Sequence, residues 1–108
     1  MCYLRWMSQF FHPSRDDITL TGVMTALGDP TRLAIVKTLY CSADGRNCGE
    51  AAAPFPDMAR STLSGHFRVL RESGVILTTK KGVENINVVR LDDLEARFPG
   101  LLAKVMSY

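Results

Sequence analysis

The 108-residue sequence has no long run of hydrophobic residues. Its apolar runs are far too short to cross a bilayer, so we expect no membrane-spanning segment. The N-terminal stretch MCYLRWMSQFF contains one arginine and no continuous apolar run ending in small residues, which is unlike a signal peptide. We therefore expect a cytoplasmic protein with no membrane partner.

Cysteine is also scarce, with only Cys2, Cys41 and Cys48 in the chain. An odd number of thiols without an export signal argues against a disulfide framework, because the cytosol keeps thiols reduced. Catalytic patterns are missing as well, since no glycine-rich loop or pair of carboxylates lies near His12, in an expected flexible leader, or near His66. We expect no enzyme activity, no cofactor and no metal site.

The basic residues that are present are unevenly distributed. Hydrophobic residues make up 46% and charged residues 22% of the chain, as in ordinary globular proteins, and the length suits one domain. The net charge of +2 is modest, but residues 57–90 carry +3 and the remainder carries −1. This surplus of positive charge in one segment favours a nucleic-acid partner.

The spacing of apolar residues in the first half predicts short helices joined by tight turns. A first helix is expected from Ile18 to Leu27, ending at Gly28. Asp29 and Pro30 are a strong start for a second helix, with Asp29 as the cap and Pro30 in the first turn. The predicted buried stripe of this helix consists of Leu33, Val36, Leu39 and Tyr40.

The region after residue 40 predicts a loop with about two helical turns over 41–56 and then a clear third helix over 57–73. The buried side of this helix is marked by three apolar residues at helical spacing, and Gly74 ends it. The three residues are Leu63, Phe67 and Leu70.

The last part of the chain predicts a β-hairpin and a final helix. VILTTK and INVVRL are β-branched runs on either side of KGVEN, which places glycine in the turn. An Asp92-x-x-Glu95 pattern then starts a last helix, which Pro99 and Gly100 interrupt. The expected fold class is mainly α with a small β-hairpin.

One face of the third helix has the composition of a DNA-binding surface. A rotation of about 100° per residue puts Ser61, Gly65, Arg68 and Glu72 opposite the buried side, with Thr62 and Ser64 beside them. Small side chains let a helix backbone approach a groove, where Arg68 can reach a base edge or a phosphate. The alternative is an ordinary solvated helix face, because Ser and Arg are common on exposed helices.

The hairpin strengthens the first interpretation. Lys80 and Lys81 lie at its tip, and Asn85 and Asn87 lie on its return strand, where they could grip a phosphate backbone. A plain solubilising turn is the alternative. His66 lies about 60° from the buried stripe of the third helix, and a packing role is slightly favoured over a DNA contact.

The segments LGDPTRLAIVKTL and RSTLSGHFRVLRESGVI, taken together, resemble the ArsR/SmtB family of dimeric winged helix-turn-helix repressors, and the similarity runs from about His12 to Met106. It implies a leader over 1–16 and, over 17–108, a DNA-binding and dimerisation domain of three to four helices, a wing and a C-terminal helix. The recognition helix would span about 60–73 and the wing about 75–91.

The function implied is that of a sequence-specific transcriptional regulator, a dimeric repressor on a double-stranded DNA operator. The candidate DNA-binding residues are Arg60, Ser61, Thr62, Ser64, Gly65, His66, Arg68, Lys80, Lys81 and Asn85.

The same resemblance places the dimer interface on the first and last helices. Both helices are more apolar than the ends of a small monomer need to be, so a second copy of the chain is a plausible cover. The candidate interface residues are Leu20, Met24, Leu94, Phe98, Leu101, Leu102 and Val105.

Two alternatives remain open. The chain could be a winged-helix protein-interaction module, because a fold does not fix a function and the total charge is small. It could also be a thiol- or metal-responsive repressor, although metal sensors of the resembled family carry a Cys-x-Cys box where this chain has only Cys48. Cys2 and Cys41 would then have to join Cys48, or Cys41 and Cys48 would form a redox pair, whereas a lone cysteine more often packs as a small apolar residue. The sequence identifies no effector.

Overall fold

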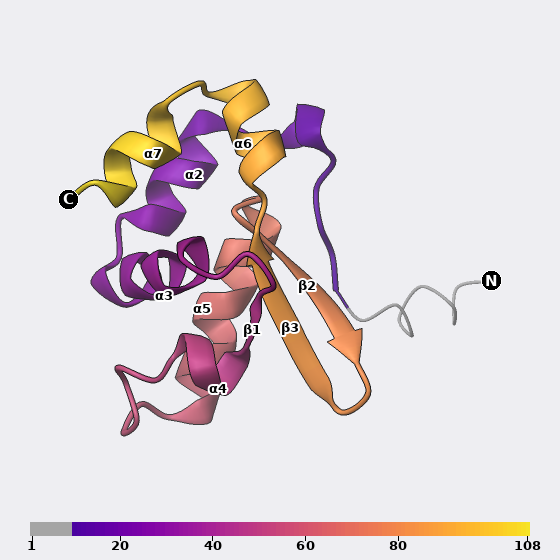
Figure 1. Cartoon of the computed structure of the whole chain (residues 1–108), viewed down its shortest axis with the longest axis vertical. Helices are drawn as coiled ribbons and strands as arrows, with labels where there is room; N and C mark the ends of the chain where they lie inside the picture. The colour runs from indigo at the N-terminus through magenta and orange to yellow at the C-terminus, as the bar shows by residue number, and fades with distance from the viewer. Residues whose placement is uncertain (1–9) are drawn as a thin grey trace.

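Helices and a small sheet alternate along the chain, and the computed structural model describes residues 10–108 (Figure 1). Two helices come first, the long helix α5 leads into a hairpin, and two short helices return to lie near α2 (Figure 1). This arrangement confirms the predicted class, a winged helix-turn-helix with a mainly α composition. The elements are η1 (Arg15–Asp17), α2 (Leu20–Leu27), α3 (Pro30–Tyr40), β1 (Arg46–Asn47), α4 (Cys48–Ala51), α5 (Arg60–Glu72), β2 (Ile76–Lys81), β3 (Glu84–Val89), α6 (Leu91–Arg97) and α7 (Leu101–Met106).

The sheet is antiparallel, with the strand order β1-β3-β2. Strands β2 and β3 form the predicted hairpin, and because Lys81 pairs with Glu84, the turn consists of Gly82 and Val83. Gly82 has a φ of +62°, in the left-handed region that favours glycine. The sequence did not predict β1, whose two residues pair with Asn87 and Ile86 of β3 and so join the wing to the segment that begins α4.

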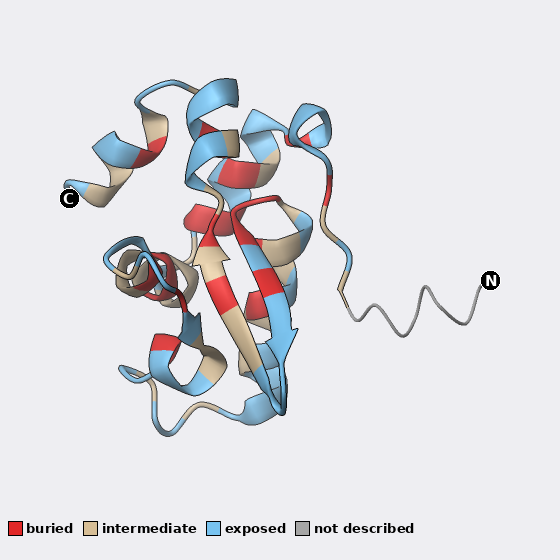
Figure 2. Ribbon diagram, turned by 45° about the vertical axis from the view of Figure 1, so that its right-hand side comes forward, coloured by how far each residue is buried: buried red, intermediate tan, exposed pale blue. Residues whose placement is uncertain are grey.

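The hydrophobic core lies where α2, α3 and α5 meet the base of the hairpin, as the buried residues in Figure 2 show. Phe67 and Leu70 of α5 are buried as predicted, and Leu63 packs against the same cluster while remaining partly exposed. On α3 the predicted stripe is wrong at one position, because Tyr40, the last residue of the helix, faces solvent. Ile35, which the stripe omitted, is fully buried instead.

Helix α2 begins later than predicted, at Leu20. The Thr19 side chain accepts a hydrogen bond of 3.0 Å from the Gly22 N–H and so caps the helix. Ile18 therefore lies before the helix, yet it is fully buried and packs against Gly74 just after α5. The prediction of Gly28 as the end of this helix is confirmed.

The starts of the later helices also differ from the prediction. Helix α5 begins at Arg60, after turns over 52–58, rather than at Asp57. Helix α6 begins at Leu91, with no side-chain cap at Arg90, so Asp92 is a first-turn acid near the positive end of the helix rather than the predicted cap. The carboxylate of Glu95 accepts a hydrogen bond from the Gly100 N–H at 3.2 Å. The interruption at Pro99 and Gly100 is confirmed, because α7 begins only at Leu101.

Within residues 10–108, no helix combines the length and the apolar character that crossing a membrane requires.

Candidate nucleic-acid interface

Helix α5 presents a low, exposed surface on the side away from the core. A Cβ atom added at Gly65 would meet no other atom within 4 Å, so the backbone of this turn is open to a large partner. Ala59, at the N-cap of α5, has no side chain that could cap the helix, so the first-turn N–H groups have no capping side-chain acceptor. The predicted residues that are exposed on this helix are Arg60, Ser61, Thr62, Ser64 and Arg68.

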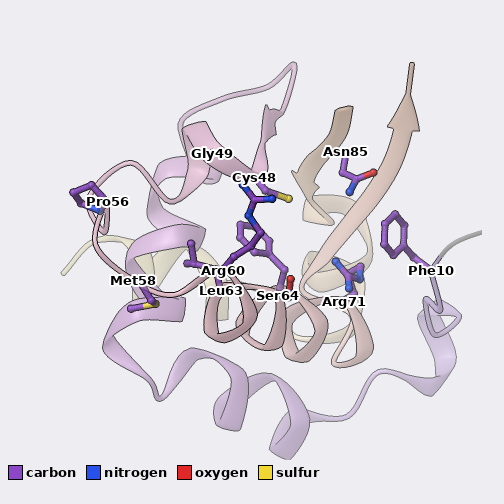
Figure 3. A pocket seen from close by; sticks show the side chains of 11 residues that line it. Phe10, Cys48, Gly49, Pro56, Met58, Arg60, Leu63, Ser64, Arg71 and Asn85 are labelled. Carbon is purple, nitrogen blue, oxygen red and sulfur yellow. The ribbon is translucent and has the colours of Figure 1, made fainter. Parts of the chain in front are cut away.

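The wing places two cations near its tip, on the last two residues of β2. Lys80 and Lys81 are both exposed, and the turn residue Val83 beside them is almost entirely exposed. Asn85, which pairs with Lys80 across the hairpin, is only half-buried, and its side chain points into a cavity between the wing and α5 (Figure 3). The lysines are thus placed for contact with a phosphate backbone, whereas Asn85 faces inward.

Asn87 does not belong to the surface of the wing, and the prediction of a phosphate contact there is wrong. The residue is fully buried. Its Oδ1 accepts a hydrogen bond of 2.7 Å from the Thr78 hydroxyl, and its Nδ2 donates to the Arg46 carbonyl at 3.2 Å and to the Cys48 Sγ at 3.4 Å. The amide joins β2, β3, β1 and the start of α4, so it fixes the base of the wing.

The two motifs that carry the family resemblance meet in one hydrogen-bonded cluster. Asp29 accepts bonds from the N–H groups of Thr31 and Arg32, at 2.9 and 3.0 Å, and so caps α3 as predicted. These bonds, above all the one from Arg32, hold the pKa of the Asp29 carboxyl below its usual value. The Arg32 guanidinium in turn donates to the carbonyls of Ala26 and Thr25 at the end of α2, at 2.8 and 3.2 Å.

His66 connects this cluster to α5. Its Nδ1 lies 3.2 Å from an Arg32 nitrogen and 3.9 Å from the Asp29 carboxylate, and its side chain is only 17% exposed. The ring therefore packs against the junction of α2 and α3 and sets the orientation of α5. For His66 the sequence slightly favours packing over a DNA contact, and the geometry also favours packing.

A segment before the first helix lies against the wing, so the prediction of a flexible leader around His12 is wrong for residues 10–13. The Nε2 of His12 accepts a hydrogen bond of 3.0 Å from the Thr78 N–H on β2, and Arg90 donates to the Pro13 carbonyl at 2.7 Å. The Arg71 guanidinium lies 4.3 Å from the centre of the Phe10 ring. Burial, together with the positive charges of Arg90 and Arg71, lowers the pKa of His12 below 6.5, so the neutral, accepting form is favoured.

The cysteines occupy different environments. Cys41 is exposed at the end of α3, whereas Cys48 is half-buried and lines the cavity beside α5. Cys2 lies outside the described residues. Over 10–108, no three histidine, cysteine or acidic side chains are grouped closely enough to hold a metal ion.

The candidate dimer residues divide into two groups. Leu94 and Leu102 are 2% and 7% exposed and pack within the chain against the core, so neither offers surface to a partner, contrary to the prediction. Leu20 and Met24 on α2 are 48% and 52% exposed. The remaining candidates, Phe98, Leu101 and Val105, are partly buried against the core.

Comparisons with known proteins agree with this geometry. A helix-turn-helix domain family matches residues 27–79. YceK of Bacillus subtilis (strain 168), an uncharacterized HTH-type transcriptional regulator, is 36% identical over 87 residues, which cover 81% of this chain and 86% of that protein. The crystal structure of the ArsR family transcriptional regulator RHA00566 is 32% identical with a TM-score of 0.65, over 79% of this chain and 90% of that one. The transcriptional repressor BigR from Xylella fastidiosa has the same fold, with 23% identity and a TM-score of 0.56 over 80% of this chain and 97% of its own.

Proposed function

Because the chain belongs to the ArsR family of winged helix-turn-helix transcriptional regulators, which bind DNA, we propose that it is a dimeric repressor that inserts α5 into the major groove of its operator. The observation that supports this most is the exposed face of α5. Its outward side carries small hydroxyl residues, a glycine and Arg68, while the other side is fixed by the core and by His66. A duplex DNA partner implies a cytoplasmic protein.

In this proposal the side chains of α5 and the wing have different tasks. Arg68 contacts a base edge, and the hydroxyls of Ser61, Thr62 and Ser64 contact bases or phosphates. Lys80 and Lys81 hold the flanking phosphate backbone, because both are exposed at the end of β2, where the hairpin turns (Figure 1). A second copy of the chain supplies the other half-site contact, about one helical turn away.

The proposal is tested first at Arg68. The operator is identified by footprinting the DNA upstream of the gene, and Arg68→Ala is then titrated against it by fluorescence anisotropy. The variant should lose about 1–3 kcal/mol of specific binding and little binding to unrelated duplex. Lys37→Ala, on α3, is the control for charge alone. Equal operator affinity of Arg68→Ala and the parent protein would show that Arg68 does not contact the bases.

A further inference from the structure

A cavity of about 580 Å³ lies between α4, α5, the return strand of the wing and the segment that carries Phe10 (Figure 3). Its volume is in the range of about 300–1,000 Å³ that is usual for small-molecule sites. The polar groups that line it are Cys48, Arg60, Ser64, Arg71 and Asn85, and Met58, Leu63 and Phe67 contribute apolar wall. Two of these groups are cations and, among the described lining residues, none is acidic.

Arg71 is the least satisfied of these groups. It is half-buried beneath the Phe10 ring, and within residues 10–108 its side chain has no hydrogen bond and no ion pair. Burial lowers the pKa of its guanidinium, although an arginine remains charged at neutral pH. A partly desolvated cation is stabilised by a nearby anion. Residues 1–9 contain no aspartate or glutamate, so that part of the chain has no carboxylate side chain to offer.

Asn85 lines the same cavity, but its oxygen is closed off from it. The Oδ1 is inaccessible to solvent, so an occupant of the cavity cannot reach this atom. Figure 3 shows the Asn85 side chain on the same side of the cavity as Arg71, where it contributes polar wall. The lining therefore favours an anion at Arg71 and requires no donor group on the occupant.

We propose that this cavity binds a small organic carboxylate with an apolar body, the carboxylate pairing with Arg71. The apolar body lies against Leu63 and Phe67. A free carboxylate is favoured over a DNA phosphate because Arg71 is half-buried and its guanidinium stacks on the Phe10 ring, 4.3 Å from the ring centre.

The position of the cavity gives such a ligand an effect on DNA binding. Arg60 and Ser64 line the cavity and also belong to the proposed DNA-contacting face of α5. A ligand that fills the cavity contacts Arg60 and Ser64 and holds these side chains away from DNA, while its carboxylate at Arg71 reduces the positive potential that attracts phosphate. The carboxylate therefore acts as an effector that weakens operator binding, a consequence that rests on the function proposed above.

Calorimetric titration of the full chain without DNA tests the site directly. The probes are mandelate, which has a carboxylate and an aromatic body, and methyl mandelate, which has the same body without the charge. Mandelate should bind saturably, and methyl mandelate should bind at least about tenfold more weakly. Absence of saturable mandelate binding would overturn the proposal.

Variants assign the contacts. Arg71→Gln should lose mandelate binding by about tenfold or more, and Arg71→Lys should retain part of it. Lys37→Gln removes one charge on α3, outside the cavity, and should leave mandelate binding unchanged. Thermal unfolding confirms that each variant is folded. Equal losses in Arg71→Gln and Lys37→Gln would show a diffuse effect of charge and would contradict the site.

The effect on DNA is measured separately, by adding mandelate to the operator complex. Release of DNA by mandelate, absent in Arg71→Gln, supports the effector role. If mandelate binds the free protein but leaves the DNA complex unchanged, the cavity is a ligand site and the effector role is wrong. If the protein binds no operator while mandelate still binds, the proposed function fails and the site remains. Competition for mandelate by unrelated duplex alone would instead assign Arg71 to a DNA phosphate.

Discussion

At the scale of single residues, Asn87 shows how a polar side chain on a wing serves stability rather than DNA binding. Asn87→Ala should destabilise the protein by about 1–3 kcal/mol, because it leaves the buried Thr78 hydroxyl without its acceptor and the Arg46 carbonyl without a donor. Urea unfolding measures the change. Thr79→Ala, on the exposed side of β2, is the matched control and should change stability by less than about 0.5 kcal/mol. A loss in Asn87→Ala no larger than in this control would show that the amide is dispensable.

His12 provides a test of pH dependence. Only its neutral ring can accept the Thr78 N–H, and burial, then Arg90 and Arg71, lower its pKa in the folded chain below 6.5. The unfolded chain thus binds the proton more readily, so the stability contributed by this contact is complete above pH 6.5 and declines as the pH falls below 6.5 through the folded pKa. An NMR titration of the imidazole signals, assigned with His12→Gln, should give a midpoint below 6.5. A midpoint at or above that value would contradict the contact.

At the scale of elements, a methyl group added at Gly65, inside α5, and one added at Gly74, just after α5, should have opposite effects on stability. Gly74 has a φ of +87°, and a Cβ there would lie 2.5 Å from the Ile18 Cγ1 in the core. Gly74→Ala should therefore cost about 1–3 kcal/mol, from the left-handed backbone and from the displaced isoleucine. Gly65 lies inside the helix with open space around it, so Gly65→Ala should stabilise the protein by about 0.5–1 kcal/mol.

Gly65→Ala also separates stability from DNA binding. It should weaken operator binding although the protein is more stable, because the added methyl group stands between the backbone of α5 and the groove. Thermal unfolding and anisotropy on each variant measure the two effects. A Gly65→Ala protein with full operator affinity would place the DNA contact on another part of the helix.

The wing acts as an electrostatic element. Replacing both Lys80 and Lys81 with alanine should weaken binding to all duplexes alike and should reduce the slope of log affinity against log salt by up to about two. The control replaces Lys37 and Lys104, two lysines on α3 and α7, and should leave the slope nearly unchanged. If the two double variants have the same slope, the wing tip does not contact DNA.

At the scale of the whole molecule, the features that were predictable from sequence are those with local causes. Asp29 caps the helix it precedes, Gly82 sits in a turn that requires its φ, and Pro99 with Gly100 separates two helices. The burial of Asn87 depends on partners 9 to 41 residues away. Strand β1 has only two residues and forms because β3 is beside it. Such pairings arise from tertiary packing, which local patterns do not encode.

The candidate DNA-binding site shows the same division. The exposure of Arg68 and the hydroxyl residues followed from helical periodicity, because Phe67 and Leu70 fix the buried side of α5. The contacts of His12, Arg71 and Phe10 were not predictable, since the segment around residues 10–13 has no periodic pattern and its hydrogen bonds span up to 77 residues. Leu94 and Leu102 are apolar residues near the end of the chain, as a dimer surface requires. Both nevertheless pack inside the chain, against the core and beside α2.

The last prediction concerns assembly of two chains. Leu20 and Met24 are about half exposed on α2, and because α2 packs with α6 and α7, the proposed interface lies at this end of the molecule. Met24→Asp separates assembly from folding better than a change at Leu101, which is partly buried in the chain's own core. In the monomer the new carboxylate faces water, whereas in the dimer it is buried without a partner, at a cost of several kcal/mol. The variant should sediment as a folded monomer at micromolar concentration, and it should bind the operator far more weakly because a single α5 and wing make too few contacts.

Thr21→Asp, an exposed position on the same helix, controls for added charge and should remain dimeric. A Met24→Asp protein that stays dimeric would place the interface elsewhere, and a folded monomer with undiminished operator affinity would refute the paired-helix mechanism.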